Sequence, residues 1–320
     1  MAIKLDLEKA YDHLEWGFIR DTLKLFKFPD RFVSLIVSCV STTFVSVLFN
    51  RGTLDSFQTS RGIRQGDPLS TYLFILCMEV LGALIAEKCQ ANLGNPIRVS
   101  QGGPSLSHLF FADDLMLFAK ADCKNCIAIK EVLESFCDLS GQKISRDKSR
   151  VFFSPNLDSD SREEMCGILG FQSTQSLGKY LGFPIKHTGS PQDFGFIIDC
   201  VQNKLAGWKA NLLSFVGKVI LTQSVTSTIP NYVMQCNVLT AKILQGVDRL
   251  SHNFLWGSSE NKKKVHLISW DKITKPREKD GLGIHAAKPK NTALLAKLNW
   301  RFDTEKSSLW AHVLSHKYRP

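Results

Sequence analysis

Two adjacent aspartates, Asp113 and Asp114, lie between two short apolar runs, and this feature constrains the fold more than any other in the sequence. The residues 109–112 that precede them are Leu-Phe-Phe-Ala, and the residues 115–118 that follow are Leu-Met-Leu-Phe. Short apolar runs on either side of a two-residue polar tip are typical of a β-hairpin. Neighbouring carboxylates repel each other unless a cation meets them. The pattern predicts a hairpin whose tip is either a plain polar turn or part of a metal site.

A third aspartate has a similar setting. Asp6 lies near the end of a strand that the sequence predicts over residues 3–7. Hard ions such as Mg²⁺ take carboxylate oxygens and phosphates as ligands, so three aspartates brought together from two strand ends would make a two-metal site for phosphoryl transfer. On spacing alone, an ordinary Asp-Asp turn explains the doublet equally well.

Charge divides the chain into two parts. Residues 1–186 hold 21 basic and 21 acidic residues, whereas residues 187–320 hold 19 basic and 9 acidic ones, which accounts for the whole net charge of +10. A neutral part followed by a basic part favours a polyanionic partner bound by the C-terminal region, and an ordinary solvated basic surface is the alternative. The length of 320 residues is typical of about two domains.

The remaining composition indicates an intracellular protein, nuclear or cytoplasmic. The nine cysteines are odd in number and form no compact framework, which favours reduced thiols. Charges interrupt the N-terminal sequence before an apolar stretch develops, so we expect no signal peptide. Residues 69–86 approach the length of a membrane span, but Ser70, Thr71 and Glu79 interrupt them. We expect a buried core helix there and no contact with a membrane.

Periodicity and turn residues predict short strands mixed with helices up to residue 186 and mostly helices afterwards. The predicted helices cover residues 12–26, 30–40, a segment beginning at Asp67-Pro68, a segment ending before Gly141, one opened by a capping box at Ser161 and Glu164, and later segments from Ser190-Pro191, over 214–228 and over 240–256. The predicted strands are a pair over 44–49 and 53–59 turned at residues 50–52, one near 151–153 and a pair beginning near 179–183.

Five stretches in this order resemble the consecutive motifs of reverse transcriptases. The first three are residues 4–12 (KLDLEKAYD), 61–70 (RGIRQGDPLS) and 110–114 (FFADD). The two later ones are residues 140–149 (SGQKISRDKS) and 180–184 (YLGFP). The series is similar to the polymerases of non-LTR, LINE-type retrotransposons, particularly those of plants. The resemblance is strong over residues 1–186 and weaker downstream, through Trp208, Lys218 and the stretch Phe254-Leu255-Trp256-Gly257.

This resemblance implies an α+β fold and an RNA-directed DNA polymerase. We expect a palm over residues 1–186, in which a small antiparallel sheet is backed by helices, then a helical thumb over 187–260 and a basic C-terminal extension over 261–320. The partners implied are an RNA template, a DNA primer and deoxynucleoside triphosphates.

The resemblance also implies roles for single residues. Asp6 and Asp113 match the principal ligands of two Mg²⁺ or Mn²⁺ ions, with Asp114 and the backbone carbonyl of Leu7 as further ligands. Lys148, with Lys143 as its rival, matches a cation near the leaving phosphate; either lysine can equally be solvated.

Further matches concern the nucleotide and the nucleic acid. Tyr11 matches an aromatic residue that excludes a 2′-hydroxyl, although a half-buried packing tyrosine is the alternative. Gln65 and Gly66 match residues beside the incoming nucleotide and template base, although without the motif they are an ordinary turn. The resemblance places five residues on the nucleic acid: Tyr180 and Gly182 in a primer-holding hairpin, and Lys204, Lys209 and Lys218 on phosphates.

The sequence departs from the family pattern in two ways. Thr71 replaces a proline found in many relatives, which the first turn of a helix tolerates. The sequence begins within the first motif, so we expect this chain to lack the endonuclease of the family and the fingers, which supply much of the clamp on the nucleotide triphosphate. A non-catalytic nucleic-acid-binding remnant is therefore the alternative function. The pair Cys123 and Cys126 has the spacing of a zinc knuckle but no second pair, so we expect free thiols.

Overall fold

A computed structural model describes residues 1–185, 194–206, 212–258 and 264–318. It divides into two compact units, of which the first comprises Met1–His187 with Val313–Pro320 and the second comprises Thr188–His312. Each unit is described by itself below. The finer division into palm, thumb and extension stays a prediction.

The first unit is built around a five-stranded sheet with the order β11-β10-β1-β9-β8. Strand β1 (Ala2–Leu5) pairs antiparallel with both β9 (Asp114–Phe118) and β10 (Arg150–Phe152). Strand β8 (His108–Phe111) forms the predicted hairpin with β9, and β11 (Gln172–Ser173) runs parallel to β10. The sheet therefore places the first and third sequence motifs on adjacent central strands.

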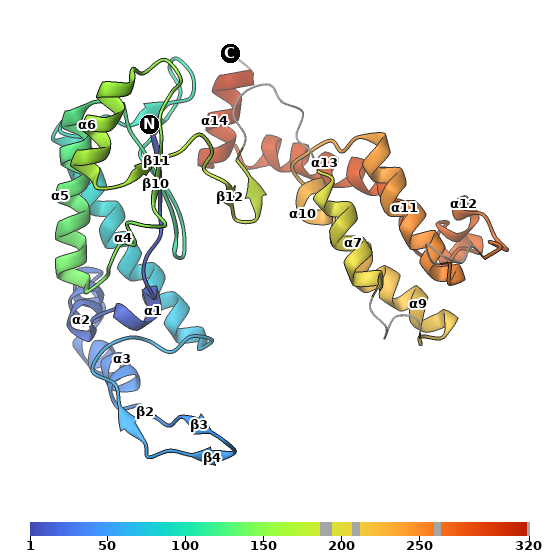
Figure 1. The fold of residues 1–320 in the computed structure, drawn as a ribbon, viewed down its shortest axis with the longest axis horizontal. Coiled ribbons are helices and arrows are strands. Elements are labelled where there is room, and N and C mark those ends of the chain that lie inside the picture. The colour runs from blue at the N-terminus through green and yellow to red at the C-terminus, as the bar shows by residue number, and fades with distance from the viewer. Residues whose placement is uncertain (186–193, 207–211, 259–263, 319–320) are drawn as a thin grey trace. The chain divides into compact units, whose positions relative to one another are not determined.

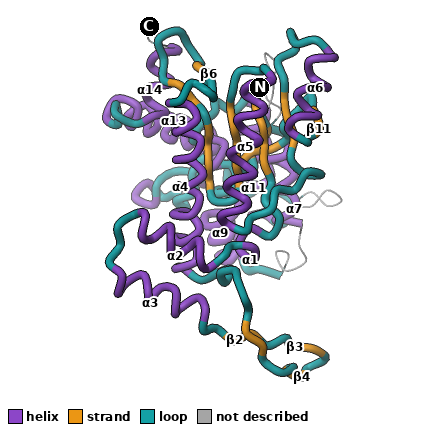
Figure 2. The backbone as a smooth tube through the Cα atoms, turned by 90° about the vertical axis from the view of Figure 1, so that its left-hand side faces the viewer, coloured by secondary structure: helices purple, strands orange, loops and turns teal. Residues whose placement is uncertain are grey.

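Helices cover one face of this sheet. Helices α4 (Pro68–Gln90) and α5 (Cys123–Ser140) run along it, as Figure 2 shows. Helix α2 (Trp16–Leu25) packs against both of them, and α6 (Ser159–Leu169) packs against α5. Because strand side chains alternate between faces, every second residue points toward the helices. These inward residues are almost fully buried and form the core: Ile3, Leu5, Leu115, Leu117 and Val151.

Helix α4 is the longest and most apolar helix among the described residues. By length and composition it is the one helix in the described ranges that can cross a membrane, and 39% of its apolar window is buried inside the protein. Its start confirms the prediction, because the Asp67 carboxylate accepts a hydrogen bond from the Leu69 N–H (3.0 Å) and Pro68 occupies the first turn. Leu73, Phe74 and Leu81 place it in the core.

Two predicted helix boundaries were wrong. The helix expected over 12–26 is divided into α1 (Ala10–His13) and α2, because Glu15 is extended and its N–H donates to the carbonyl of Ser140 (3.0 Å). Helix α6 is capped by Asp158, which accepts a hydrogen bond from the Ser161 N–H (2.8 Å), and not by Ser161 itself. Asp158 lies one turn earlier and provides the same kind of oxygen acceptor.

Short antiparallel ladders extend from the unit. Helix α3 (Asp30–Ser41), as predicted, leads into an arm in which β2 (Phe44–Val45) pairs with β5 (Phe57–Gln58) and β3 (Leu48–Phe49) with β4 (Gly52–Thr53). Figure 1 shows this arm protruding from the first unit. Two further ladders join β6 (Ile97–Arg98) to β7 (Ser105–Leu106) and β12 (Lys179–Tyr180) to β13 (Phe183–Pro184). The predicted strand pairs are confirmed.

The second unit is helical in its described residues. Helix α11 (Ala241–Trp256) packs against α7 (Phe196–Ala206), α9 (Phe215–Leu221) and α13 (Ala287–Thr304). The other elements are a π-helix (Thr222–Thr226), α10 (Asn231–Met234), α12 (Trp270–Ile273), a 3-10 turn (Arg277–Lys279) and α14 (Leu309–Tyr318), which continues into the first unit. The helix predicted over 240–256 is confirmed, whereas Ser190-Pro191, the predicted start of α7, lies outside the described residues.

A buried amide holds the middle of the second unit together. The Asn291 side chain, on α13, is 3% exposed and donates to the carbonyls of Met234 and Asn237, both at 2.9 Å. Its Oδ1 accepts a hydrogen bond from the Leu239 N–H at 3.0 Å. A buried amide that uses most of its hydrogen-bonding capacity fixes its surroundings, so Asn291 anchors the loop between α10 and α11 to α13.

Candidate active site

Asp6 and the aspartate doublet lie at the same end of the sheet. The last aligned pair between β1 and β9 is Leu5 with Leu115, so Asp6 and Asp114 occupy the next positions on two adjacent strands. Facing positions of an antiparallel pair project to one face. That face is opposite the helices, because Leu5 and Leu115 are buried against them. Asp113 is exposed at the hairpin tip. The fold thus brings together two segments that are remote in sequence.

The carboxylates of Asp6, Asp113 and Asp114 are the oxygen ligands that hard cations prefer. In this structure their side chains do not converge on one point. Within the described residues, no group of three or more His, Cys, Asp and Glu side chains lies close enough to hold a metal ion. Leu7 faces Ile144 in an antiparallel bridge whose hydrogen bonds belong to the flanking residues. The polar backbone atoms of Leu7 therefore point away from Ile144. The donor set fits the predicted metal site in chemistry and backbone placement.

The fourth motif wraps around Asp6. The N–H of Asp6 donates to Oγ of Ser149 (3.1 Å), and its carbonyl accepts from the Ser145 N–H (2.9 Å). Lys148 Nζ lies 3.8 Å from Asp6 Oδ1. Both side chains are substantially exposed, so this ion pair adds little stability. Of the two rival lysines, Lys148 is the one placed beside Asp6, while Lys143 contributes its backbone carbonyl to the N–H of Glu8.

Tyr11 is held by an aromatic contact. Its ring stacks on that of Phe74 in α4, with centroids 4.9 Å apart and an interplanar angle of 11°. The side chain is half-buried, and the Tyr11 carbonyl accepts a hydrogen bond from the Ile63 N–H (2.9 Å). This contact fixes the orientation of the ring. Such a placement suits both a packing residue and a rigid surface for a sugar, so the role of Tyr11 stays a prediction.

The second motif is locked against the first by its glycine. Gly62 has φ +88°, and a Cβ there would lie 2.8 Å from the carbonyl oxygen of Asp12. The Gly62 N–H donates to the Leu14 carbonyl (2.8 Å), and the Trp16 indole N–H donates to the Gly62 carbonyl (2.7 Å). Gln65 and Gly66 follow this anchored segment and are exposed. They are therefore accessible to a ligand.

The predicted nucleic-acid contacts fall in both units. Tyr180 and Gly182 belong to the β12–β13 hairpin, and Lys4 Nζ, which is on the same face of β1 as Asp6, donates to the carbonyl of Lys179. Lys204 is exposed in the last turn of α7, and Lys218 is half-buried in α9. Lys209 and Trp208 lie outside the described residues.

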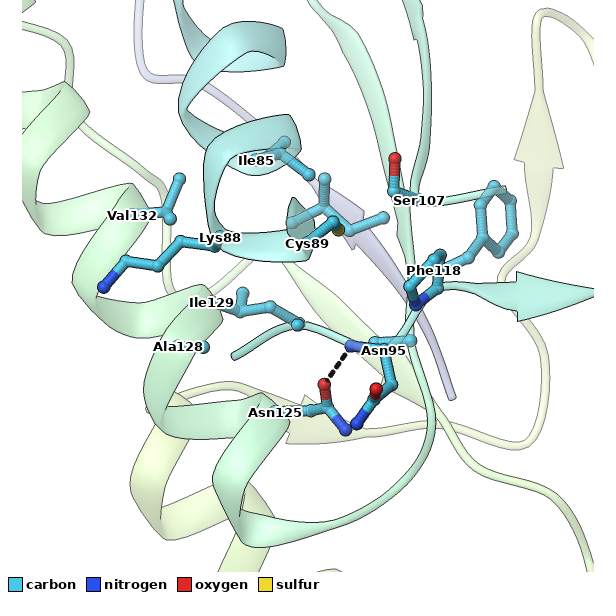
Figure 3. Close-up of a pocket in the computed structure, with 14 residues that line it drawn as sticks. Ile85, Lys88, Cys89, Asn95, Ser107, Phe118, Asn125, Ala128, Ile129 and Val132 are labelled. Carbon is cyan, nitrogen blue, oxygen red and sulfur yellow. Dashed lines mark hydrogen bonds between the residues drawn. The ribbon is translucent and has the colours of Figure 1, made fainter. Parts of the chain in front are cut away.

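An apolar pocket of the first unit lies away from this site. It lies between α4, α5 and the base of the β8–β9 hairpin, where Ile85, Ile129 and Phe118 line it (Figure 3). The Asn95 N–H donates to Oδ1 of Asn125 on its polar side (2.6 Å). Phe118 is at the opposite end of β9 from Asp114. This pocket is therefore lined by none of the three aspartates.

Comparison with protein families decides the ancestry of this arrangement. The family model described as "Reverse transcriptase (RNA-dependent DNA polymerase)" matches residues 1–185, which contain all five motifs. The chain belongs to the reverse transcriptase family. Members of this family generally use divalent metal ions, and they bind an RNA template and nucleotides.

Curated relatives indicate the LINE type. A putative ribonuclease H protein of Arabidopsis thaliana is 45% identical over 39% of this chain and 20% of its own length. The uncharacterized 149 kDa protein of transposon TX1 of Xenopus laevis is 24% identical over 99% of this chain and 24% of its own length. The Pol polyprotein of the type-2 retrotransposable element R2DM of Drosophila melanogaster is 32% identical over 45% of this chain and 13% of its own length. The chain therefore carries a non-LTR, LINE-type RNA-directed DNA polymerase domain, and it spans a quarter or less of the length of these three relatives.

The sequence did not reveal the residues that hold the backbone of the first motif in place. Ser149 and Ser145 position Asp6, and the buried Gln142 donates from Nε2 to the Ala10 carbonyl (2.7 Å). All three lie in the fourth motif, between and beside the two lysines for which the resemblance implies a role. The sequence carries no local signal for this role, because Gln142, Ser145 and Ser149 are common polar residue types in loops. The burial of these serines and this amide follows only from the folded structure.

Proposed function

We propose that this chain is the catalytic part of a reverse transcriptase that adds deoxynucleotides to a DNA primer on an RNA template. The observation that supports this proposal most is the alignment of β1 with β9, which puts Asp6 beside Asp114 on the face of the sheet opposite the helices. The neighbouring hairpin tip presents Asp113 to the same end.

In this proposal Asp6, Asp113 and Asp114, with the carbonyl of Leu7, hold two Mg²⁺ or Mn²⁺ ions. Such ions, when bound, lower the pKa of the primer 3′-hydroxyl and neutralise charge on the leaving pyrophosphate. Ser149 and Ser145 hold the backbone of Asp6 against the fourth motif. Lys148, whose Nζ lies 3.8 Å from Asp6 Oδ1, is the cation that we assign to the leaving phosphate.

Other residues select and hold the substrates. The ring of Tyr11, fixed by Phe74, leaves no room for a 2′-hydroxyl and so favours deoxynucleotides. Gln65 contacts the nucleotide or template base, and Gly66 allows close approach of the backbone. The hairpin with Tyr180 and Gly182 holds the primer strand. Lys204, Lys209 and Lys218 contact phosphates, which position a duplex without specifying its sequence.

Primer extension tests this function. The wild-type chain with a primed RNA template should extend the primer only with Mg²⁺ or Mn²⁺, and Asp113→Asn should lose nucleotide addition while it stays folded. Asp55→Asn, a change at an exposed aspartate of the β-arm, is the matched control and should extend normally. Undiminished metal-dependent extension by Asp113→Asn refutes the assignment.

A non-catalytic nucleic-acid-binding remnant is the second candidate, and the charge of residues 187–320 favours it. In that case the wild-type chain would bind an RNA–DNA duplex with a steep salt dependence but would never extend the primer. Extension that requires Asp113 rejects this second candidate.

A further inference from the structure

Two lysine ammonium groups meet at the C-terminal end of α11. Helix α11 ends at Gly257, which has φ +70°. A Cβ built on Gly257 would lie 3.1 Å from Nζ of Lys218 and 3.3 Å from Nζ of Lys264. The two cations therefore approach the same point of the backbone, although they come from segments 46 residues apart in sequence. Any larger residue at 257 would occupy the space between them.

Local contacts direct both lysines to this point. Lys218 lies on α9, and its Nζ is 5.6 Å from the centroid of the Phe254 ring, a cation–π distance. The backbone N–H of Lys264 donates to Oγ of Ser258 (3.0 Å), which ties the Lys264 segment to the residue after Gly257. Lys218 is therefore held by its position on α9 and by the Phe254 ring, and Lys264 by the hydrogen bond of its backbone to Ser258.

The two charges have no acidic partner among the residues that the structure describes. Within the described ranges, neither Lys218 nor Lys264 forms an ion pair with a carboxylate. Two ammonium groups this close repel each other. The carbonyl groups at the end of α11 offset part of this repulsion, because a helix C-terminus carries partial negative charge. A bound anion would offset it more completely.

The surroundings add hydrogen-bonding groups and rings. The rings of His252 and His266 have centroids 4.1 Å apart, and Nε2 of His266 lies 3.5 Å from Oγ of Ser258. Trp256 stacks on His266 with centroids 6.5 Å apart. Cations beside aromatic and imidazole rings are typical of surfaces that bind nucleic acid. An apolar protein partner would instead require the two lysines to lose their hydration.

We infer that Lys218 and Lys264 form a phosphate-binding site for a nucleic-acid backbone at the C-terminal end of α11. Of these two lysines, the resemblance to polymerases implies a phosphate contact only for Lys218; the structure adds Lys264 and the glycine that lets both approach. The site takes a phosphodiester group of either strand and reads no base. It deepens the proposed function by locating a duplex contact, and it does not depend on catalysis.

Salt-dependent binding of a short RNA–DNA hybrid by the full chain tests this site. Fluorescence anisotropy at several NaCl concentrations gives the slope of log affinity against log salt. Each lost phosphate contact lowers this slope by about 1. Lys218→Gln and Lys264→Gln should each lower the slope, and the double variant, which loses the single phosphodiester contact of this site, should lower it by about 1. Lys242→Gln, at the other end of α11, is the matched control and should leave the slope unchanged.

Conservative variants keep the test valid if a glutamine variant fails to fold. Lys218→Arg and Lys264→Arg preserve the charge and should retain the wild-type slope, with circular dichroism as the check on folding. Equal slopes for the double variant and wild type, an equal loss in Lys242→Gln, or no duplex binding by wild type would each overturn the site. Primer extension by Asp113→Asn is a separate readout, so failure of this site and failure of the polymerase proposal are distinguishable.

Discussion

The backbone N–H of Asp6 donates a hydrogen bond of 3.1 Å to Oγ of Ser149, which links the first motif to the fourth. Ser149 is fully buried, and its own N–H donates to the Ser145 carbonyl (2.9 Å). We expect Ser149→Ala to lower the free energy of unfolding by about 1–2 kcal/mol, since it leaves a partly buried donor unpaired. Urea denaturation measures this loss. Ser154→Ala, at an exposed serine, should change stability by less than about 0.5 kcal/mol; equal effects of the two variants would contradict the role of Ser149.

Comparison of Gly62 with Gly66 separates two costs of replacing a glycine: the steric clash of the new Cβ and the strain of a positive φ. Both have positive φ, +88° and +86°, but a Cβ would meet the Asp12 carbonyl only at Gly62. Gly66→Ala should cost about 1–2 kcal/mol, the penalty of left-handed backbone for a residue with a side chain. Gly62→Ala should cost more, because the first motif must also move. Thermal denaturation of the two variants gives the comparison, and a smaller loss for Gly62→Ala would show that this packing is wrong.

The cysteines should differ sharply in reactivity. Burial raises the pKa of both the Cys77 and Cys126 thiols to about 12, so thiolate is scarce at pH 8. Cys39, Cys200 and Cys236 are exposed. In a titration with a disulfide reagent, the three exposed thiols should react first, and Cys77 and Cys126 should react only after denaturant is added. Mass spectrometry of the labelled peptides identifies them; early labelling of Cys126 would contradict the packing of α5.

Acid should destabilise the first unit through His108. Burial lowers the pKa of this imidazole, and the Glu79 carboxylate only partly opposes the shift. The unfolded chain therefore binds more protons, so the stabilising contribution is complete above about pH 6.5 and is lost as pH falls through the folded-state pKa. His108→Gln should flatten the dependence of the urea midpoint between pH 8 and pH 5. Burial also lowers the pKa of His252, so the informative quantity is the difference between wild type and variant. An unchanged pH profile in the variant would reject this explanation.

Elements marked by local chemistry were predictable from the sequence. The β8–β9 hairpin, the Asp67-Pro68 start of α4 and the end of α5 at Gly141 each depend on neighbouring residues. The break between α1 and α2 was not predictable, because its cause is a hydrogen bond from Glu15 to Ser140, more than a hundred residues away. The cap at Asp158 was missed for a different reason, since Asp158 and Ser161 are equally good caps by type.

In the candidate site, too, features set by neighbouring residues were predictable and features set by distant residues were not. The motifs identified its aspartates, and the alignment of β1 with β9 then depends on long-range strand pairing. Ser149 and Gln142 are ordinary polar residues in sequence, and only their burial behind Asp6 and Ala10 reveals a positioning role. The approach of Lys218 and Lys264 to Gly257 likewise brings together three segments that no local pattern connects.

Binding of Mn²⁺ to the full chain, followed by electron paramagnetic resonance, tests most directly whether Asp6 and the doublet share one metal site. The account predicts that the wild-type chain binds Mn²⁺ and that Asp6→Asn, Asp113→Asn and Asp114→Asn each weaken binding at least about tenfold, while Asp55→Asn binds as wild type. If Asp6→Asn binds Mn²⁺ as tightly as the wild-type chain does, the opening aspartate does not belong to the site and the polymerase mechanism proposed for this chain is wrong.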